Sequence, residues 1–243
     1  MPLIKPSDVK AALATVQKRI AQACASRGRQ PGDVSILAVT KGFGVDAIEA
    51  ALAAGLTDIG ENYYQEAREK FATREWPKGV ARHFVGRVQR NKARQIAALF
   101  DVVQTVDDLA IARALDDGAA GQRKTLSVLV QVNAAGDERQ GVAPDELADF
   151  IVSLRVFSNI RVRGLMVVGP HNPEATAGAF ERARSLFEEL RAASPDFDTL
   201  SMGMSDDLEL AVAAGSTMVR IGTALFGARP PKAKGASSIG FSA

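Results

Sequence analysis

The residue with the clearest chemical potential is Lys41, which ends the apolar run 35–40 and is followed at once by Gly42. A strand that stops on a lysine places an amine at the end of a sheet, where burial can lower its pKa and let it attack a carbonyl carbon. Most lysines in such positions are simply hydrated. In parallel α/β folds, however, active groups lie at the carboxyl ends of strands, and Lys41 ends the first predicted strand.

A phosphate could be held by the turn 200–207, which joins a short predicted strand to a helix. Gly203 lets a backbone approach a ligand closely. Ser205 can cap the helix or donate to a phosphate oxygen. Asp206 and Asp207 favour the plain helix cap, because they complement the helix dipole and would repel a second anion.

A second glycine-bearing turn, 219–227, has the same character. The N–H groups of Gly222 and Thr223, together with Ser205, would form an uncharged phosphate nest. Arg220 is a functional candidate because buried arginines are rare unless they are paired. An amine combined with a phosphate cradle indicates a ligand that is both an aldehyde and a phosphate ester.

The remaining reactive side chains give weaker signals. His83 and His171 are the only histidines and Cys24 is the only cysteine, so no transition-metal site is predicted. His171 is expected in a loop. A strand histidine such as His83 is more often satisfied by hydrogen bonds than used as a general base.

A cluster of cations stands at the start of a predicted helix, and such clusters are usually solvated. It lacks interleaved aromatic residues that could stack on nucleotides, so no nucleic-acid partner is predicted. Glu61 and Glu66 could pair with these cations. The cluster consists of Arg82, Arg87, Arg90, Lys92 and Arg94.

The overall composition describes an ordinary globular chain. It has 243 residues, a hydrophobic fraction of 47% and a net charge of +2, which compels neither a nucleic-acid nor a membrane partner. The single cysteine excludes an intrachain disulfide and fits a reducing compartment. The amino terminus lacks the apolar core of a signal peptide, and no apolar run could span a membrane. We expect a cytoplasmic protein.

The elements that must position these residues alternate along the chain. A first helix is predicted from Ser7 as its N-cap, with apolar residues recurring at helical spacing as far as Cys24. The strands are predicted at 35–40, 57–60, 82–86, 101–105, 125–133, 160–167, 198–202 and 217–221. The helices between them are predicted at 45–54, 62–72, 90–98, 107–117, 144–155, 174–193 and 206–214.

Strands that alternate with helices imply βαβ units and a parallel sheet. Eight strands can close a barrel, although a doubly wound open sheet also fits the pattern. No internal linker is evident, so one domain is predicted over 1–228. The segment 229–243 has the composition of a disordered tail.

Several motifs together resemble the pyridoxal phosphate homeostasis protein family, also called the YggS or proline-synthase co-transcribed family. Each motif is weakly specific alone, but the set covers nearly the whole chain in the expected order. The matching stretches are 38–41, 60–66, 83–92, 164–166, 200–206, 214–217 and 220–227. Within them, Thr40 stands where many members have serine, Arg87-Val88 and Arg90 replace a stretch often written with proline, leucine and serine, and Gln140 replaces a frequent lysine.

The resemblance implies a single (β/α)8 TIM-type barrel with an extra N-terminal helix, like the N-terminal domain of alanine racemase and other fold type III proteins. It implies pyridoxal 5′-phosphate held on Lys41 as a reversible aldimine, with Arg220 near the pyridine nitrogen. Asn62 would lie close to the cofactor and His83 within the barrel mouth. The full set of expected cofactor-binding residues is Lys41, Asn62, His83, Met202, Gly203, Ser205, Arg220, Gly222 and Thr223.

Three functions fit an aldehyde bound to Lys41. A cofactor carrier would hold pyridoxal phosphate and release it to pyridoxal-phosphate-dependent enzymes. A racemase needs a second base, and Tyr63 and Tyr64, the only tyrosines, are expected at the start of a helix, although proton abstraction by the lysine alone stays open. A class I aldolase needs a carboxylate near the lysine, for which Glu61 is the candidate.

The carrier ranks first among these functions. An arginine beside the pyridine nitrogen would keep that nitrogen unprotonated and weaken the ring as an electron sink. We therefore expect a protein that takes part in vitamin B6 homeostasis without robust catalysis, and no catalytic residue is assigned. We expect it to be a monomer or weak dimer.

Overall fold

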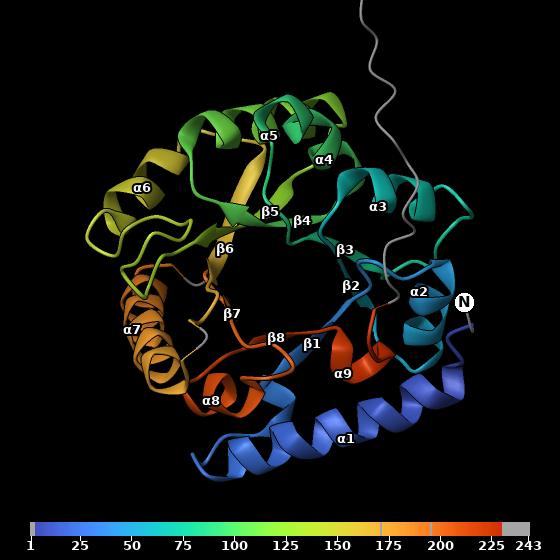
Figure 1. Ribbon diagram of the computed structural model, residues 1–243. Helices are drawn as coiled ribbons and strands as arrows, with labels where there is room; N and C mark the ends of the chain where they lie inside the picture. The colour runs from blue at the N-terminus through green and yellow to red at the C-terminus, as the bar shows by residue number, and fades with distance from the viewer. Residues whose placement is uncertain (1–2, 171, 195, 230–243) are drawn as a thin grey trace, which may run out of the picture.

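The computed structural model describes residues 3–170, 172–194 and 196–229. Eight parallel strands form a closed barrel in which each strand pairs with the next and β8 (Met218–Ile221) pairs with β1 (Ser35–Val39) (Figure 1). The predicted TIM-type barrel is confirmed, and the open-sheet alternative is wrong. His171 and residues 230–243 of the expected tail lie outside the described residues.

All eight predicted strands are present, and each end lies within two residues of its expected position. The strands between β1 and β8 are β2 (Asp58–Glu61), β3 (Ala81–Phe84), β4 (Val102–Val106), β5 (Leu126–Gln131), β6 (Ile160–Met166) and β7 (Thr199–Ser201). The runs are rich in valine, isoleucine and leucine because a parallel strand is covered on both faces.

The helices form a ring around the barrel (Figure 1). They are α1 (Pro6–Ala25), α2 (Val45–Ala53), α3 (Tyr64–Phe71), α4 (Ala93–Leu99), α5 (Leu109–Gly121), α6 (Leu147–Leu154), α7 (Pro173–Ala192), α8 (Leu208–Ala213) and α9 (Thr223–Phe226), with 3-10 turns η1 (Pro31–Asp33) and η2 (Arg90–Lys92). The sequence did not predict α9, because four residues are too few to show helical periodicity. The predicted helix 90–98 is divided into η2 and α4.

The additional helix α1 packs outside the barrel against α2, α8 and α9 (Figure 1). It begins at Pro6 and its N-cap is Lys5, so the prediction of Ser7 as the cap is wrong. Proline suits the first helical position because its φ is already helical and its missing N–H needs no partner there. Arg19 of α1 pairs with Glu209 of α8 at 2.6 Å.

Successive side chains of each strand point alternately out of the barrel and into it, and they pack in two separate hydrophobic clusters. Outward side chains pack beneath the helices in the large core, which includes Phe84 and Phe100. Inward side chains Leu37, Val39 and Met218 form a small separate cluster inside the barrel. The period of two residues along each strand assigns every strand residue to one of these environments.

Gly164 of β6 is the position where the barrel tolerates a side chain least. Its φ is +152°, and a Cβ atom would lie 1.7 Å from the carbonyl oxygen of Thr199 in β7. We expect Gly164→Ala to lower the free energy of unfolding by more than about 3 kcal/mol, because strand pairing must open to admit the methyl group.

Denaturant unfolding would measure this effect, with Gly178→Ala as its control. Gly178 lies exposed in α7 with no heavy atom within 4 Å of the added Cβ. Alanine there should stabilise the protein by about 0.5–1 kcal/mol. Equal effects of the two substitutions would contradict the close approach of β6 and β7.

Candidate functional site

A cavity of about 410 Å³ opens at the carboxyl ends of the strands. This volume is within the range of small-molecule sites. Six of the expected site residues line it, namely Lys41, Asn62, Ser205, Arg220, Gly222 and Thr223. The other lining residues are Val39, Phe43, Val85, Met166, Val168, Met204, Asp206 and Arg229. The structure thus brings the amine, the arginine and both glycine-bearing turns to one place.

Lys41 occupies the turn that follows β1 and is half-buried. Burial lowers the pKa of its amine, and the positive charges of Arg229 and Arg220 lower it further, whereas Glu61 opposes this shift. A lowered pKa increases the fraction of neutral amine at neutral pH, and the neutral amine is the nucleophile. The electrostatics therefore favour attack on a carbonyl carbon.

The two turns meet through Ser205, whose Oγ accepts a hydrogen bond of 3.2 Å from the N–H of Ala224 in α9. The carbonyl oxygen of Ser205 accepts from Nη2 of Arg19 at 2.9 Å, which ties the turn to α1. Asp206 also lines the cavity and is exposed. This side of the cavity offers a hydroxyl and turn backbone next to one solvated carboxylate.

Arg220 lies at the inner wall of the cavity and is only 6% exposed. Nη1 donates to the carbonyl oxygen of Ser201 at 2.8 Å, and Nη2 donates to that of Val167 at 2.9 Å. Burial lowers the pKa of Arg220 to about 10, a shift that Asp207 opposes. The guanidinium therefore remains charged at neutral pH and is held in one orientation.

Three of the expected site residues do not line the cavity. Met202 and Gly203 are buried beside it, and the missing side chain of Gly203 faces Ala211 in α8, where a Cβ would lie 2.4 Å from that alanine's Cβ. The glycine therefore permits helix packing and a φ of +94°, and no ligand approach through it is evident.

His83 was expected in the barrel mouth, but it lies deeper inside the barrel. It is 3% exposed, and its Nε2 lies 2.9 Å from Oδ1 of Asp58, the first residue of β2. Val85, two residues further along the chain, is the residue of this strand face that reaches the cavity. The alternation of side chains along a strand predicts that His83 points into the barrel. How far His83 lies below the cavity depends on where the strand ends, which the sequence does not show.

Sequence reasoning missed a buried cluster around Lys70 that holds both neighbours of Lys41. Nζ of Lys70 donates to the carbonyl oxygen of Thr40 at 2.8 Å and to Oε1 of Glu61 and of Glu66, each at 2.6 Å. Oε1 of Glu61 also accepts from Oγ1 of Thr40 at 2.6 Å, and Oε1 of Glu66 accepts from the N–H of Gly42 at 2.6 Å. The expected pairing of these glutamates with the Arg82–Arg94 cations is therefore wrong.

Those cations do not act as one group. Arg82 pairs with Asp101 and Arg94 with Asp117, both at 2.9 Å. A lysine 30 positions after Thr40 gave no local sign of its role, because the cluster forms only when α3 packs on the ends of β1 and β2.

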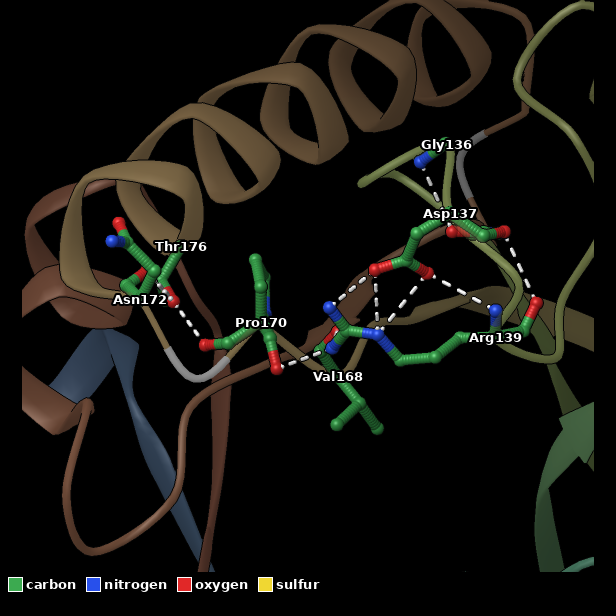
Figure 2. Close-up of polar contacts among 9 residues, drawn as sticks. Gly136, Asp137, Arg139, Val168, Pro170, Asn172 and Thr176 are labelled. Atoms are coloured by element: carbon green, nitrogen blue, oxygen red, sulfur yellow. Dashed lines mark hydrogen bonds and ion pairs between the residues drawn. The ribbon is translucent and has the colours of Figure 1, made fainter.

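Two loops beside the cavity are joined by Arg139, which follows β5 (Figure 2). Its Nη1 donates to the carbonyl oxygen of Gly169 at 2.7 Å, and its Nη2 pairs with Asp137 at 2.6 Å. Gly169 follows Val168, a lining residue. At the start of the next helix, Asn172 accepts a capping hydrogen bond of 3.0 Å from Ala175. The wall formed by Val168 is therefore fixed from both sides.

The electrostatic contribution of Arg229 to Lys41 can be tested directly. We expect Arg229→Gln to raise the pKa of Lys41 and to shift its reaction with a small amine-reactive reagent to higher pH. The shift should be less than about one pH unit, because Arg229 is exposed and salt screens its charge. Mass spectrometry of the Lys41 peptide would follow the labelling. Arg182→Gln on α7 makes the same charge change and should leave the profile in place, whereas a shift to lower pH for Arg229→Gln would contradict this account.

Other kinds of site have no support in the part of the chain that the structure describes. No cluster of histidine, cysteine and acidic side chains there could hold a metal ion. None of the described helices is long and apolar enough to cross a membrane.

Comparison with known proteins agrees with this geometry. The family model of the alanine racemase N-terminal domain matches residues 12–230. The pyridoxal phosphate homeostasis protein of Pseudomonas aeruginosa is 43% identical over 92% of this chain and 96% of its own length. The protein of the same name from Escherichia coli K12 is 40% identical over 92% and 97%.

Solved structures extend the comparison. PipY of Synechococcus elongatus, crystallised with pyridoxal phosphate bound, is 35% identical and superposes with a TM-score of 0.75 over 87% of this chain and all of PipY. Alanine racemase of Clostridium difficile is 17% identical, with a TM-score of 0.71 over 94% of this chain and 58% of the racemase, and so shares the fold. The barrel, the cavity and these identities show that the chain belongs to the pyridoxal phosphate homeostasis protein family.

Proposed function

We propose that this protein binds pyridoxal 5′-phosphate at the cavity and takes part in cofactor homeostasis. The observation that carries the proposal is a half-buried amine of lowered pKa facing the same cavity as a guanidinium and two hydroxyl-bearing turns. This donor set suits the cofactor, which carries an aldehyde, a ring nitrogen and a phosphate ester. PipY, a relative crystallised with pyridoxal phosphate, supports the assignment.

Each lining group has a distinct role in this proposal. Lys41 Nζ bonds the aldehyde carbon with loss of one water, and the reverse addition of water releases the ligand. Ser205, Gly222 and Thr223 hold the phosphate. Arg220 would face the ring nitrogen, where its fixed positive charge would keep that nitrogen unprotonated. When bound, the cofactor supplies an electron sink, and an unprotonated ring nitrogen weakens it.

The arrangement favours a carrier over a racemase or an aldolase. Neither Tyr63 nor Tyr64 lines the cavity, so the second base of a tyrosine-dependent racemase is absent from its described lining. Glu61, the candidate carboxylate for an aldolase, points away into the Lys70 cluster. The carboxylate among the lining residues is that of Asp206, which is exposed to solvent and follows the turn of Ser205.

As a carrier, the protein would pass its ligand to other proteins. A covalent link that water can reverse suits transfer of the cofactor to pyridoxal-phosphate-dependent enzymes in the cytoplasm. We propose that the protein does this as a monomer or weak dimer, without robust turnover of amino acids.

The test combines reduction with a turnover assay. Wild-type protein incubated with pyridoxal phosphate and then with borohydride should carry the cofactor on the Lys41 peptide, as read by mass spectrometry. The unreduced protein should transfer the cofactor to an apo-enzyme and should leave the enantiomers of amino acids unchanged. Labelling at other lysines only, or appreciable racemisation, would overturn the proposal.

A further inference from the structure

The interior of this barrel contains a continuous line of polar side chains. Barrel interiors are usually filled by branched apolar residues, and here Leu37, Val39 and Met218 occupy only part of the space. Polar residues of β2, β3, β4, β7 and β8 occupy another part. They are Asp58, His83, Gln104, Ser201 and Arg220.

Each residue of the line contacts the next within hydrogen-bond distance. Arg220 Nη1 donates to Oγ of Ser201 at 3.0 Å, and that hydroxyl donates to Oε1 of Gln104 at 2.7 Å. Nε2 of Gln104 lies 2.9 Å from Nδ1 of His83, and Nε2 of His83 lies 2.9 Å from Oδ1 of Asp58. Four contacts therefore join the cavity to the amino-terminal end of the barrel.

The direction of donation is the same at every contact. The amide nitrogen of Gln104 can only donate, so Nδ1 of His83 must accept and carries no proton. The proton of the neutral ring then lies on Nε2 and is donated to the Asp58 carboxylate. The line runs from a cation to an anion, which strengthens each hydrogen bond through polarisation of its neighbours.

Burial makes the line sensitive to any change in its members. His83, Gln104, Ser201 and Arg220 are all buried, and Gln104 and Ser201 are fully so. Among the described residues, Arg220 has no carboxylate within ion-pair distance, because its direct partners are two carbonyl oxygens and the Ser201 hydroxyl. Asp58 is the carboxylate at the end of the line, whereas Asp207 is the carboxylate whose charge acts on Arg220.

We propose that Asp58, His83, Gln104 and Ser201 are positioning residues that orient the Arg220 guanidinium at the cofactor cavity. The Ser201 hydroxyl donates its hydrogen bond to Gln104, which leaves its lone pairs directed at Arg220. Gln104 is held in the matching orientation because its amide nitrogen donates to His83. The state of a histidine deep in the barrel thus controls the group that faces the ring nitrogen. The effect on the cofactor rests on the proposed function, whereas the line itself does not.

The first experiment uses the protein without cofactor and reads the protonation of His83. ¹⁵N NMR of histidine-labelled protein, assigned with His171→Gln, should show a protonated Nε2 and an unprotonated Nδ1. In Gln104→Glu, which is nearly isosteric, the amide donor to Nδ1 is lost. The ¹⁵N shift of Nδ1 of His83 should then change. A proton on Nδ1 in wild type, or unchanged ¹⁵N shifts in Gln104→Glu, would disprove the proposed series of hydrogen bonds.

The second experiment measures the affinity for pyridoxal phosphate by titration. Ser201→Ala and Gln104→Leu should each weaken binding roughly three- to tenfold, since each deprives Arg220 of support equivalent to about one hydrogen bond. Ser216→Ala is the matched control, because Ser216 is equally buried but bonds only to backbone carbonyls outside the line. Its affinity should equal that of wild type.

The outcomes separate this inference from the proposed function. Unchanged affinity in both Ser201→Ala and Gln104→Leu, with wild type binding normally, would overturn the positioning role and leave the carrier proposal intact. Failure of wild type to bind the cofactor would overturn the carrier proposal, while the ¹⁵N pattern of His83 would still decide whether the line exists. If Ser201→Ala does not fold, the affinity of Gln104→Leu and the ¹⁵N shifts of Gln104→Glu still test the proposal.

Discussion

Lys41→Ala is expected to abolish the visible absorption band that wild type develops with pyridoxal phosphate. Without the amine no covalent link to the aldehyde carbon can form, and borohydride should leave no label on the protein. Affinity should fall on the order of 100-fold, which corresponds to about 2.8 kcal/mol. In the proposed binding mode the remaining affinity should come from Arg220, Ser205 and Thr223, which line the same cavity.

The fold should tolerate this loss. Lys41 is half-buried at the cavity, and desolvation is the main cause of its lowered pKa, so removing the amine also removes a charge that burial disfavours. Thermal unfolding of Lys41→Ala should therefore stay within about 1 kcal/mol of wild type. Lys10→Ala on the exposed face of α1 is the control that should keep the band. A reducible label in Lys41→Ala would place the covalent site elsewhere.

The sequence predicted the parts of the site that depend on chain order. Lys41, Ser205 and Thr223 each follow a predicted strand, and the carboxyl ends of parallel strands meet at one end of a barrel. Their convergence therefore followed once eight strands were recognised. Closure of the barrel itself needed the pairing of β8 with β1, which no local pattern encodes.

The parts that sequence analysis missed depend on depth and on long-range packing. His83 pairs with Gly60 in the sheet and its side chain contacts Asp58, and the chain reaches the cavity at Val85, one residue after the end of β3. Arg229 belonged to a segment with the composition of a disordered tail, yet it lines the cavity and acts on Lys41. Gln104 gave no signal, since a glutamine in an apolar strand has no distinctive chemistry until its neighbours are known.

The largest effect on stability is expected from Lys70→Met. Lys70 is 7% exposed and Glu61 is fully buried, and all three ammonium protons are used on Thr40, Glu61 and Glu66. Methionine would leave the Glu61 carboxylate buried without its cation, a change that typically costs about 3–5 kcal/mol. Oε2 of Glu61 already has no hydrogen-bond partner among the described residues, so the hydroxyl of Thr40 on Oε1 would be the only hydrogen bond left to the carboxylate.

The loss should depend on pH in a defined direction. Burial raises the pKa of Glu61 above its ordinary value of 4.5, and Lys70 opposes that shift. Lys70→Met removes the opposition, so the folded protein binds the Glu61 proton more tightly than the unfolded chain does. Stability of the variant then falls as the pH rises above 4.5 and recovers as the pH falls back through the raised pKa.

Urea unfolding of four proteins over a range of pH would test this account: wild type, Lys70→Met, the double variant Glu61→Gln/Lys70→Met, and Lys18→Met. The double variant removes the buried charge and should be more stable at neutral pH than Lys70→Met alone. Lys18 is exposed on α1, so its substitution should change stability by less than about 0.5 kcal/mol. A double variant less stable than Lys70→Met would show that packing, and not the buried charge, dominates the cluster.

The same cluster connects stability to the cofactor site. Lys70 and its two glutamates hold Thr40 and Gly42, the residues on either side of Lys41. Lys70→Met should therefore slow formation of the covalent link under conditions where the variant is still folded, because the turn that presents the amine loses its anchor on α3. The double variant should remain slow even though its stability recovers, since it does not restore the hydrogen bond from Lys70 to the carbonyl oxygen of Thr40. Recovery of both properties together would mean that the cluster acts on Lys41 only through global stability.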